Sequence, residues 1–226
     1  MKRSEINAIM RSADAFIRER GFILPPFAYW SPDDWRAKGP EAREIVENHL
    51  GWDITDFGQG DFQKLGLFLF TVRNGNPARP EDKPYAEKIM LVEVGQVTPM
   101  HFHWKKTEDI INRGGGTLVV QIYASTPDEG LDEQKSVQVS VDGVVRTVEP
   151  GGLVELAPGE SITLTPYTYH SFWGEGSRVL IGEVSSVNDD LTDNRFATPL
   201  GRFPGIEEDE PPLHLLIIDY AKHYHV

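Results

Sequence analysis

Two histidines and a glutamate lie close together in the sequence, at a spacing that metal sites use. His101 and His103 are separated by one residue, and Glu108 follows five residues later. Alternate side chains of an extended strand point the same way, so the ring nitrogens of the two histidines can meet one ion. Glu108 can return on a neighbouring turn or strand to add an oxygen. This mixed donor set suits manganese, iron, nickel or zinc, and it predicts a divalent metal site.

His170 is the expected fourth ligand. It follows a strand-like run that ends at Pro166 and a short turn, and it opens the next apolar run, which repeats the arrangement of the first motif. His223 and His225 share the one-residue spacing, but we expect this pair near the chain end to be frayed or to form a dimer contact.

The spacing of these residues resembles the first sequence motif of the cupins. That motif, glycine, five residues, His-x-His, four residues, glutamate, six residues and glycine, is matched without a gap from Gly95 to Gly115. The second cupin motif is matched in its opening by Gly152 and Pro158, whereas Thr168 stands where a glycine is usual. The resemblance implies a cupin barrel, a double-stranded β-helix of the jelly-roll type.

Composition narrows the class of protein and partner. With 226 residues, 39% of them hydrophobic, the chain can bury one core and needs no second domain. The absence of cysteine excludes disulfides and thiolate ligands. A net charge of -13 disfavours nucleic acid and anionic membrane surfaces as partners. With no apolar signal core and no run of about 20 apolar residues, we expect a cytoplasmic protein without a membrane segment.

Hydrophobic periodicity predicts helices first and strands afterwards. Helical spacing indicates one helix over 4–20 and another over 33–49. Short strands separated by glycine and proline turns are predicted over 65–73, 86–94, 117–124, 136–141, 144–148, 178–184 and 213–220. We therefore expect residues 1–60 to form an N-terminal helical extension packed outside a mainly β cupin domain, and 61–226 to form the barrel with its C-terminal strand.

Beyond the cupin motifs, the chain resembles the D-lyxose isomerase family almost from end to end. The segments that carry this resemblance are 24–27, 51–58, 85–90, 98–104, 108–116 and 182–190. The resemblance implies a manganese-dependent enzyme that interconverts D-lyxose with D-xylulose, and D-mannose with D-fructose. It also implies a homodimer that acts on free monosaccharides.

Such an isomerisation moves a proton between C2 and C1 through a cis-enediol, so it needs a base and groups that stabilise charge on the substrate oxygens. Glu208, or its neighbour Glu207, and Asp219 are the candidate bases, because related isomerases place a glutamate and an aspartate at about this separation beside the substrate. Lys88, just before the metal motif, is the candidate for stabilising negative charge. Phe172 and Arg195 are candidates for the pocket wall and for a contact with a sugar hydroxyl.

Three other functions share the same ligands. An iron or nickel cupin dioxygenase would use an oxygen-reactive metal and an apolar pocket. A sugar-binding or structural cupin would bind without turnover. A cupin-type phosphoglucose isomerase would carry out the same reaction on a phosphorylated sugar. The net negative charge of the chain disfavours binding of such an anionic substrate. The preferred sugar and metal stay open at this point, because epimers differ by one hydroxyl and the ligands suit several ions.

Overall fold

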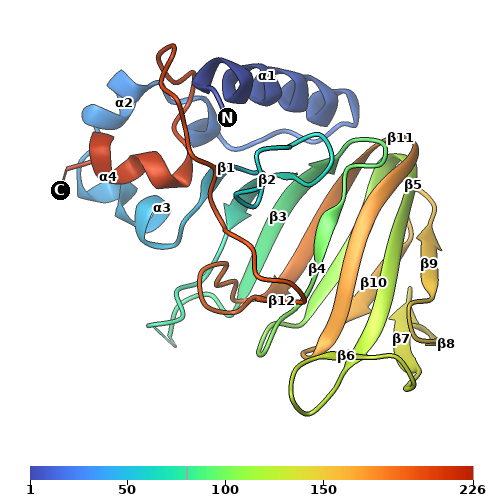
Figure 1. Ribbon diagram of the computed structural model, residues 1–226. Coiled ribbons are helices and arrows are strands. Elements are labelled where there is room, and N and C mark those ends of the chain that lie inside the picture. The colour runs from blue at the N-terminus through green and yellow to red at the C-terminus, as the bar shows by residue number, and fades with distance from the viewer. Residues whose placement is uncertain (80, 226) are drawn as a thin grey trace.

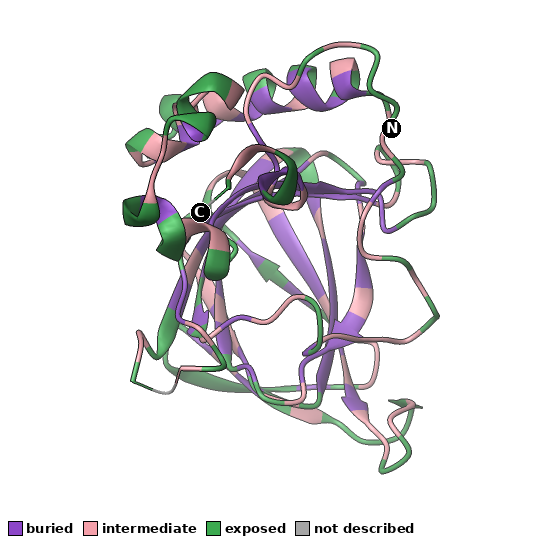
Figure 2. Cartoon of the chain, turned by 90° about the vertical axis from the view of Figure 1, so that its left-hand side faces the viewer, coloured by how far each residue is buried: buried purple, intermediate pink, exposed green. Residues whose placement is uncertain are grey.

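The computed structural model describes residues 1–79 and 81–225, and it shows a mainly β protein with its helices gathered at one end (Figure 1). The predicted first helix is confirmed as α1 (Arg3–Glu19), which ends before Gly21 with a positive φ of 77°. Its buried side faces the sheet, as Figure 2 shows. None of the helices in the two described ranges is long and apolar enough to cross a membrane.

The predicted second helix is broken into three short pieces: α2 (Pro32–Arg36), η2 (Pro40–Ala42) and α3 (Arg43–Glu47). Gly39 and Pro40 cause the break, because proline removes a helical N–H and disfavours the α conformation of the residue before it. After this segment, β1 (Gly51–Thr55) pairs antiparallel with β2 (Leu67–Arg73). The first sixty residues therefore contribute a strand to the sheet as well as helices.

The strands form one antiparallel sheet, which runs in the order β1-β2-β3-β11-β5-β10-β7-β8. After β1 and β2, its members are β3 (Tyr85–Val92), β11 (Thr168–Ser186), β5 (Glu108–Ser125), β10 (Ser161–Leu164), β7 (Val137–Val141) and β8 (Val144–Val148). The branches are β4 (Thr98–Phe102), β12 (Arg195–Phe196), β9 (Leu153–Leu156) and β6 (Leu131–Asp132). Within the described residues the sheet does not close into a continuous barrel.

Two long strands allow this sheet to form two layers. β5 and β11 pair with each other along most of their lengths. One half of each strand also pairs with the first layer, through β10 and β3, and the other half pairs with the second layer, through β9 and β4. A main hydrophobic core fills the space between the layers, with members such as Leu69, Met90, Val120 and Phe172. A second core lies between α1 and the outer side of β1, β2 and β3. The predicted cupin architecture, mainly β with helices outside, is thereby confirmed.

The predicted strand over 213–220 is wrong. Only Leu216 makes a bridge, alongside Trp52, and the chain then turns into η3 (Ile217–Asp219) and α4 (Tyr220–His223). The cause is local, because the carboxylate of Asp219 accepts a hydrogen bond from the backbone N–H of Leu216 at 3.0 Å. A hydrogen bond from a backbone N–H to an acidic side chain three residues later stabilises the start of a helix.

The segment before this turn binds the start of α1. The terminal amino group of Met1 donates to the carbonyl of Gly205 at 2.7 Å, and Lys2 forms a parallel bridge with Glu207. The Ser4 hydroxyl then donates to the carboxylate of Asp209 at 2.7 Å. These contacts join the two ends of the described chain and hold α1 against the sheet.

The glycines at the bend of β5 give a test of the fold. A Cβ at Gly116 would collide with the backbone carbonyls of Glu175 and Ser177, where β11 shifts register. We expect Gly116→Ala to lower the free energy of unfolding by about 3 kcal/mol, since backbone cannot move aside as a flexible side chain does. Gly143→Ala is the control, because its turn leaves open space and only the positive φ of 82° is strained, at about 1–2 kcal/mol. Urea unfolding measures both, and equal losses would contradict the steric explanation.

Candidate metal centre and substrate cavity

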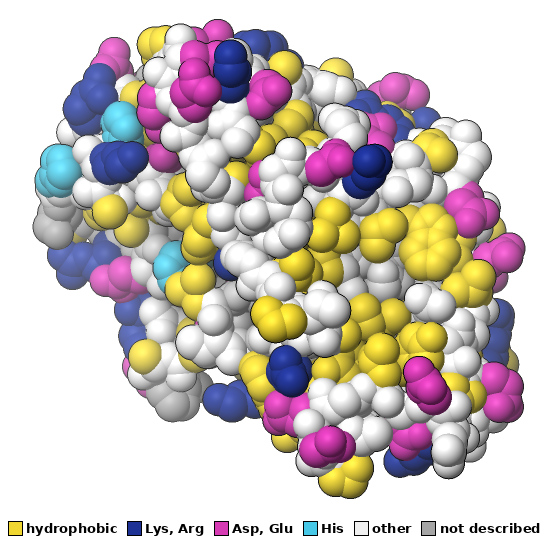
Figure 3. Space-filling view, in the orientation of Figure 1, with side chains coloured by type: hydrophobic (Ala, Val, Ile, Leu, Met, Phe, Trp, Pro, Cys, Tyr) yellow, Lys and Arg dark blue, Asp and Glu magenta, His cyan; other side chains and the backbone are white. Residues whose placement is uncertain are grey.

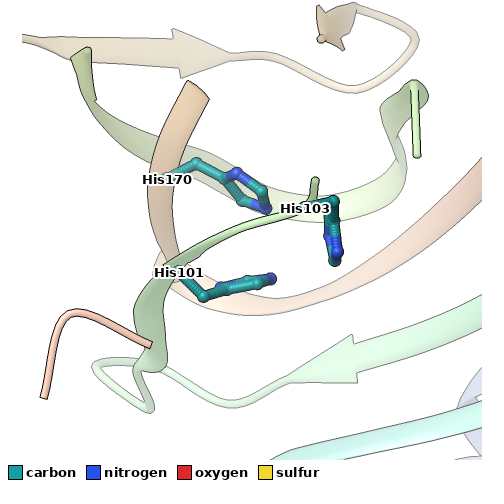
Figure 4. Close-up of side chains that lie close together, drawn as sticks. All are labelled: His101, His103 and His170. Atoms are coloured by element: carbon teal, nitrogen blue, oxygen red, sulfur yellow. The ribbon is translucent and has the colours of Figure 1, made fainter. Parts of the chain in front are cut away.

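Pairing of β4 with β11 brings the three predicted histidines together. His101 on β4 lies opposite His170 on β11 in the strand register, and His103 follows directly after β4. Ligand nitrogens of the three rings all lie within 4.8 Å of one another. Figure 4 shows the three rings turned towards a common region from two neighbouring strands.

Backbone carbonyls fix which nitrogen of each ring points inward. Each ring donates its Nδ1–H to a carbonyl, so its Nε2 carries the free lone pair. The acceptors are Pro99 for His101 at 2.7 Å, Asp193 for His103 at 2.7 Å and Thr168 for His170 at 3.0 Å. Burial, together with the neighbouring histidines, holds the pKa of His101 well below its usual value, so that this ring stays neutral.

Glu108 completes the cluster. Its Oε1 lies 3.2 Å from Nε2 of His103 and 3.1 Å from Nε2 of His170. Yet this oxygen and the His103 nitrogen are both buried and make no well-directed hydrogen bond within the described chain. The other oxygen, Oε2, is 2.6 Å from Nζ of Lys106. Burial alone would raise the pKa of Glu108, but the Lys106 ammonium and the imidazoles outweigh it and hold that pKa well below its usual range.

The residues present fit a divalent metal. Three imidazole nitrogens and one carboxylate oxygen are the donor types that Mn²⁺, Fe²⁺ and Zn²⁺ accept. Two of the four donor atoms, His103 Nε2 and Glu108 Oε1, would otherwise be buried without a partner, which is costly. The four ligands predicted from the sequence therefore lie together, in forms ready to bind a cation.

A cavity extends from this cluster across the inner face of the sheet. Its apolar lining includes Leu67, Leu69, Met90, Ile110 and the predicted wall residue Phe172. Its polar lining, besides the four candidate ligands, comprises Thr55, Lys88, Thr98, Lys106, Glu183, Asp190, Asn194 and Arg202. A cavity that combines an apolar wall with convergent polar groups can bind and orient a small molecule.

A chain of buried charges runs along one side of this cavity. From Lys106, which contacts Glu108, it passes to Oε1 of Glu183 at 3.0 Å and from there to Nζ of Lys88 at 3.6 Å. Lys88 also lies 3.0 Å from Asp190 and donates to Asn188 at 2.6 Å. The predicted inward position of Lys88 is thus observed, and its ammonium is almost fully buried.

Sequence reasoning missed several members of this chain. Lys106 lies within the first histidine motif, two residues before Glu108, and Glu183 interrupts an otherwise apolar run. Both positions are signals, because a charge on the buried face of a strand needs a partner. Asp190 and Arg202 lie in irregular segments, where no periodicity indicates which side chains point inward.

Glu208, Asp219 and Arg195, which were predicted to contact the substrate, make ion pairs outside the cavity. Glu208 and Asp219 both bind the guanidinium of Arg3, at 2.7 Å and 2.9 Å, and neither is among the residues that line the cavity. Arg195 pairs with Glu129 at 3.2 Å and likewise is not a lining residue. The acidic tail folds onto the start of α1 instead of across the cavity mouth, because the buried Arg3 attracts its carboxylates.

Known proteins place the chain in a family. The model of the family described as D-lyxose isomerase matches residues 1–220. The chain belongs to this family. It is 51% identical over 226 residues to the D-lyxose/D-mannose isomerase of Serratia proteamaculans and 48% identical to that of Escherichia coli O157:H7, in each case with 98% of this chain and 99% of the relative covered. The resemblance seen in the sequence is confirmed, and the protein is an aldose–ketose isomerase.

Solved structures support the fold. The L-ribose isomerase of Cellulomonas parahominis, solved with L-psicose, superposes with a TM-score of 0.62 at 17% identity, covering 92% of this chain and 98% of that one. The L-ribose isomerase of Acinetobacter sp. DL28, in complex with L-ribose, gives a TM-score of 0.59 at 16% identity, covering 91% and 98%. At this identity the likeness concerns the fold alone.

Lys106 is expected to position Glu108 as a metal ligand. Replacing it in Lys106→Met removes the ammonium that keeps Glu108 ionised and oriented, so metal affinity should fall about 10- to 100-fold. Competition with a chelator, followed by metal analysis, measures this affinity. The control is Lys105→Met, which removes an exposed lysine next in sequence and should leave the affinity unchanged. Unchanged affinity in Lys106→Met would show that Glu108 needs no such support.

Arg3 is expected to act in stability. Arg3→Met leaves the buried carboxylate of Asp219 without its cation, so the free energy of unfolding should fall by about 3 kcal/mol, whereas Arg18→Met, whose pair with Asp14 is exposed, should cost far less. Since the hydrogen bond from Arg3 lowers the pKa of Glu208, this part of the stability is present above the ordinary pKa near 4.5 and is lost as the pH falls below it. Urea unfolding from pH 7 to pH 3 measures both effects. An unchanged stability with lost turnover would instead place Glu208 and Asp219 in catalysis.

Proposed function

We propose that this protein is a metal-dependent isomerase that interconverts D-lyxose with D-xylulose and D-mannose with D-fructose. The observation that carries the proposal is the cluster of three histidines and Glu108 inside a cavity that also holds buried lysines and carboxylates. Two relatives at about half identity bear the name D-lyxose/D-mannose isomerase. The substrate of this proposal is a free monosaccharide, and the place of action is the cytoplasm.

The proposed metal is Mn²⁺, held by Nε2 of His101, His103 and His170 and by Oε1 of Glu108. Bound there, a divalent ion supplies Lewis-acid polarisation of the substrate oxygens. The donor set contains no thiolate, which agrees with a hard cation such as Mn²⁺. The protein's own task is to keep these donors neutral or ionised as required and to shield the reacting carbons from water.

The proton transfer between C2 and C1 is proposed to use groups beside the ligands. All polar contacts of Glu183 within the described chain, to Lys88, Lys106 and Ser185, run through Oε1. Its Oε2 is therefore free to take and return a proton in the formation and collapse of a cis-enediol. The Lys88 ammonium can donate to a substrate oxygen on which negative charge develops. Glu208 and Asp219 stay the alternative bases predicted from the sequence.

The proposal includes a homodimer. Hydrophobic side chains gather over the strand region on the face shown in Figure 3, with many of the charged side chains around them. A second copy of the chain is the proposed cover of this face, since burying apolar area drives most stable association. Sedimentation equilibrium measures the state directly.

Metal removal and restoration tests the reaction. We expect stripped protein to be inactive, and Mn²⁺ to restore formation of D-xylulose from D-lyxose and of D-fructose from D-mannose, both followed by chromatography of the sugars. His101→Ala serves as the metal-site control and should lose bound metal and turnover together. Restored metal without any ketose would count against the isomerase, and oxygen uptake or turnover of a sugar phosphate would then favour the dioxygenase or the phosphoglucose isomerase.

The same assay separates the candidate bases. Glu183→Gln should lower kcat at least 100-fold while its metal content stays that of the wild type, because the amide cannot accept the proton. Glu208→Gln is the matched comparison, since it makes the same chemical change on Arg3, outside the cavity. Loss of turnover in Glu208→Gln alone, with Glu183→Gln active, would restore the assignment made from the sequence.

A further inference from the structure

The guanidinium of Arg202 lies at the end of the chain of buried charges that begins at Glu108, beside the histidine cluster. Glu108 on β5, Glu183 on β11 and Lys88 on β3 follow one another across the inner face of the sheet, and Asp53, which binds Arg202, lies two strands beyond on β1. Along this chain of charges, Lys106, Glu183, Lys88 and Asp190 stand between Arg202 and Glu108. Arg202 therefore makes none of the printed contacts with the metal ligands, and it still lines the same cavity.

Arg202 is held on one side only. Its Nη2 binds the carboxylate of Asp53 and lies 3.6 Å from Oδ2 of Asp190, and its Cζ lies 5.0 Å from the centre of the Phe203 ring. Its Nη1, in contrast, is buried and finds no acceptor among the described residues. A buried charged donor without an acceptor is costly, which makes Nη1 a group prepared to receive an oxygen from a ligand.

The charges around Arg202 select the kind of oxygen. Asp53 is almost fully buried, and Asp190 lies between Arg202 and Lys88. A sugar hydroxyl in the cavity can accept a hydrogen bond from Nη1 and donate its own hydrogen to the carboxylate of Asp190, which also lines the cavity. A phosphate at neutral pH is chiefly an acceptor and adds negative charge beside the two carboxylates. The site thus matches a neutral hydroxyl and repels a phosphate.

We propose that Arg202, held in place by Asp53, binds together with Asp190 the hydroxyl at the non-reacting end of the sugar and thereby sets the preference for free sugars over sugar phosphates. This inference rests on the proposed function, because it takes the reacting carbons of the sugar to lie at the histidines. In this role Arg202 determines affinity and specificity, while Glu183 and Lys88 carry out the proposed proton transfer.

The test compares D-mannose with 6-deoxy-D-mannose, which lacks the terminal hydroxyl. In the wild type we expect KM to be about 10- to 100-fold higher for the deoxy sugar, with kcat changed less than threefold, since one charge-assisted hydrogen bond is lost. Arg202→Gln should raise KM for D-mannose by a similar factor and bring the ratio of the two KM values close to one. If Arg202→Gln only destabilised the protein, the ratio of the two KM values would stay that of the wild type.

Two further variants serve as controls for the comparison of the two sugars. Arg178→Gln removes an arginine that pairs with Glu93 on another part of the molecule, and it should preserve the wild-type ratio. Arg202→Lys keeps a cation between Asp53 and Asp190, so it serves where Arg202→Gln does not fold, and it should reduce the ratio at least threefold because lysine lacks the second donor nitrogen. A wild type that does not distinguish the two sugars, or an Arg202 variant with an unchanged ratio, overturns the inference.

The predicted weak binding of sugar phosphates is measured separately. D-mannose 6-phosphate should bind the metal-loaded wild type at least tenfold more weakly than D-mannose in titration calorimetry, and tighter or equal binding overturns this part of the inference. Failure of the proposed function looks different, because the metal-loaded wild type would then form no ketose from either sugar. In that case calorimetric binding of D-mannose and 6-deoxy-D-mannose still decides whether Arg202 reads the terminal hydroxyl.

Discussion

The pairing of β11 with both β4 and β5 is the constraint on which the site depends. It places His170 opposite His101 and, further along the same strand, sets Ser185 opposite Glu108. Three ligands on three strands, and His103 directly after one of them, are thereby fixed by backbone hydrogen bonds, and carbonyl partners then fix the orientation of each ring. A flexible loop could not hold the donor atoms within 4.8 Å of one another at so little entropic cost during binding.

The side of the site near the metal could be predicted from the sequence because its signals are local. His101, His103 and Glu108 lie in one short segment, and alternation along a strand decides their common face. Lys88 was found in the same way, from its place in a strand. Arg202 and Asp53 could not be found, because they meet across 149 residues and only the folded sheet brings β1 beside the cavity.

The errors in the predicted fold also have local causes. The strand expected over 213–220 has the right apolar character, but the single hydrogen bond from Leu216 to Asp219 converts it into a helical turn. The glycines at 114–116 conceal the continuity of β5, since glycine is usually a sign that a strand ends. Here glycine allows the close approach of two backbones at the bend, so the strand continues through it.

The contacts between the start of α1 and the acidic tail have a consequence for the order of events during synthesis. Arg3 leaves the ribosome long before its partners Glu208 and Asp219, which follow it 205 and 216 residues later. Until these two carboxylates emerge, the guanidinium of Arg3 at the start of α1 has no partner. The contact that fixes the start of α1 therefore forms late and closes a loop of 205 residues, and a nascent chain held before residue 208 should still expose this end of the helix to chaperones.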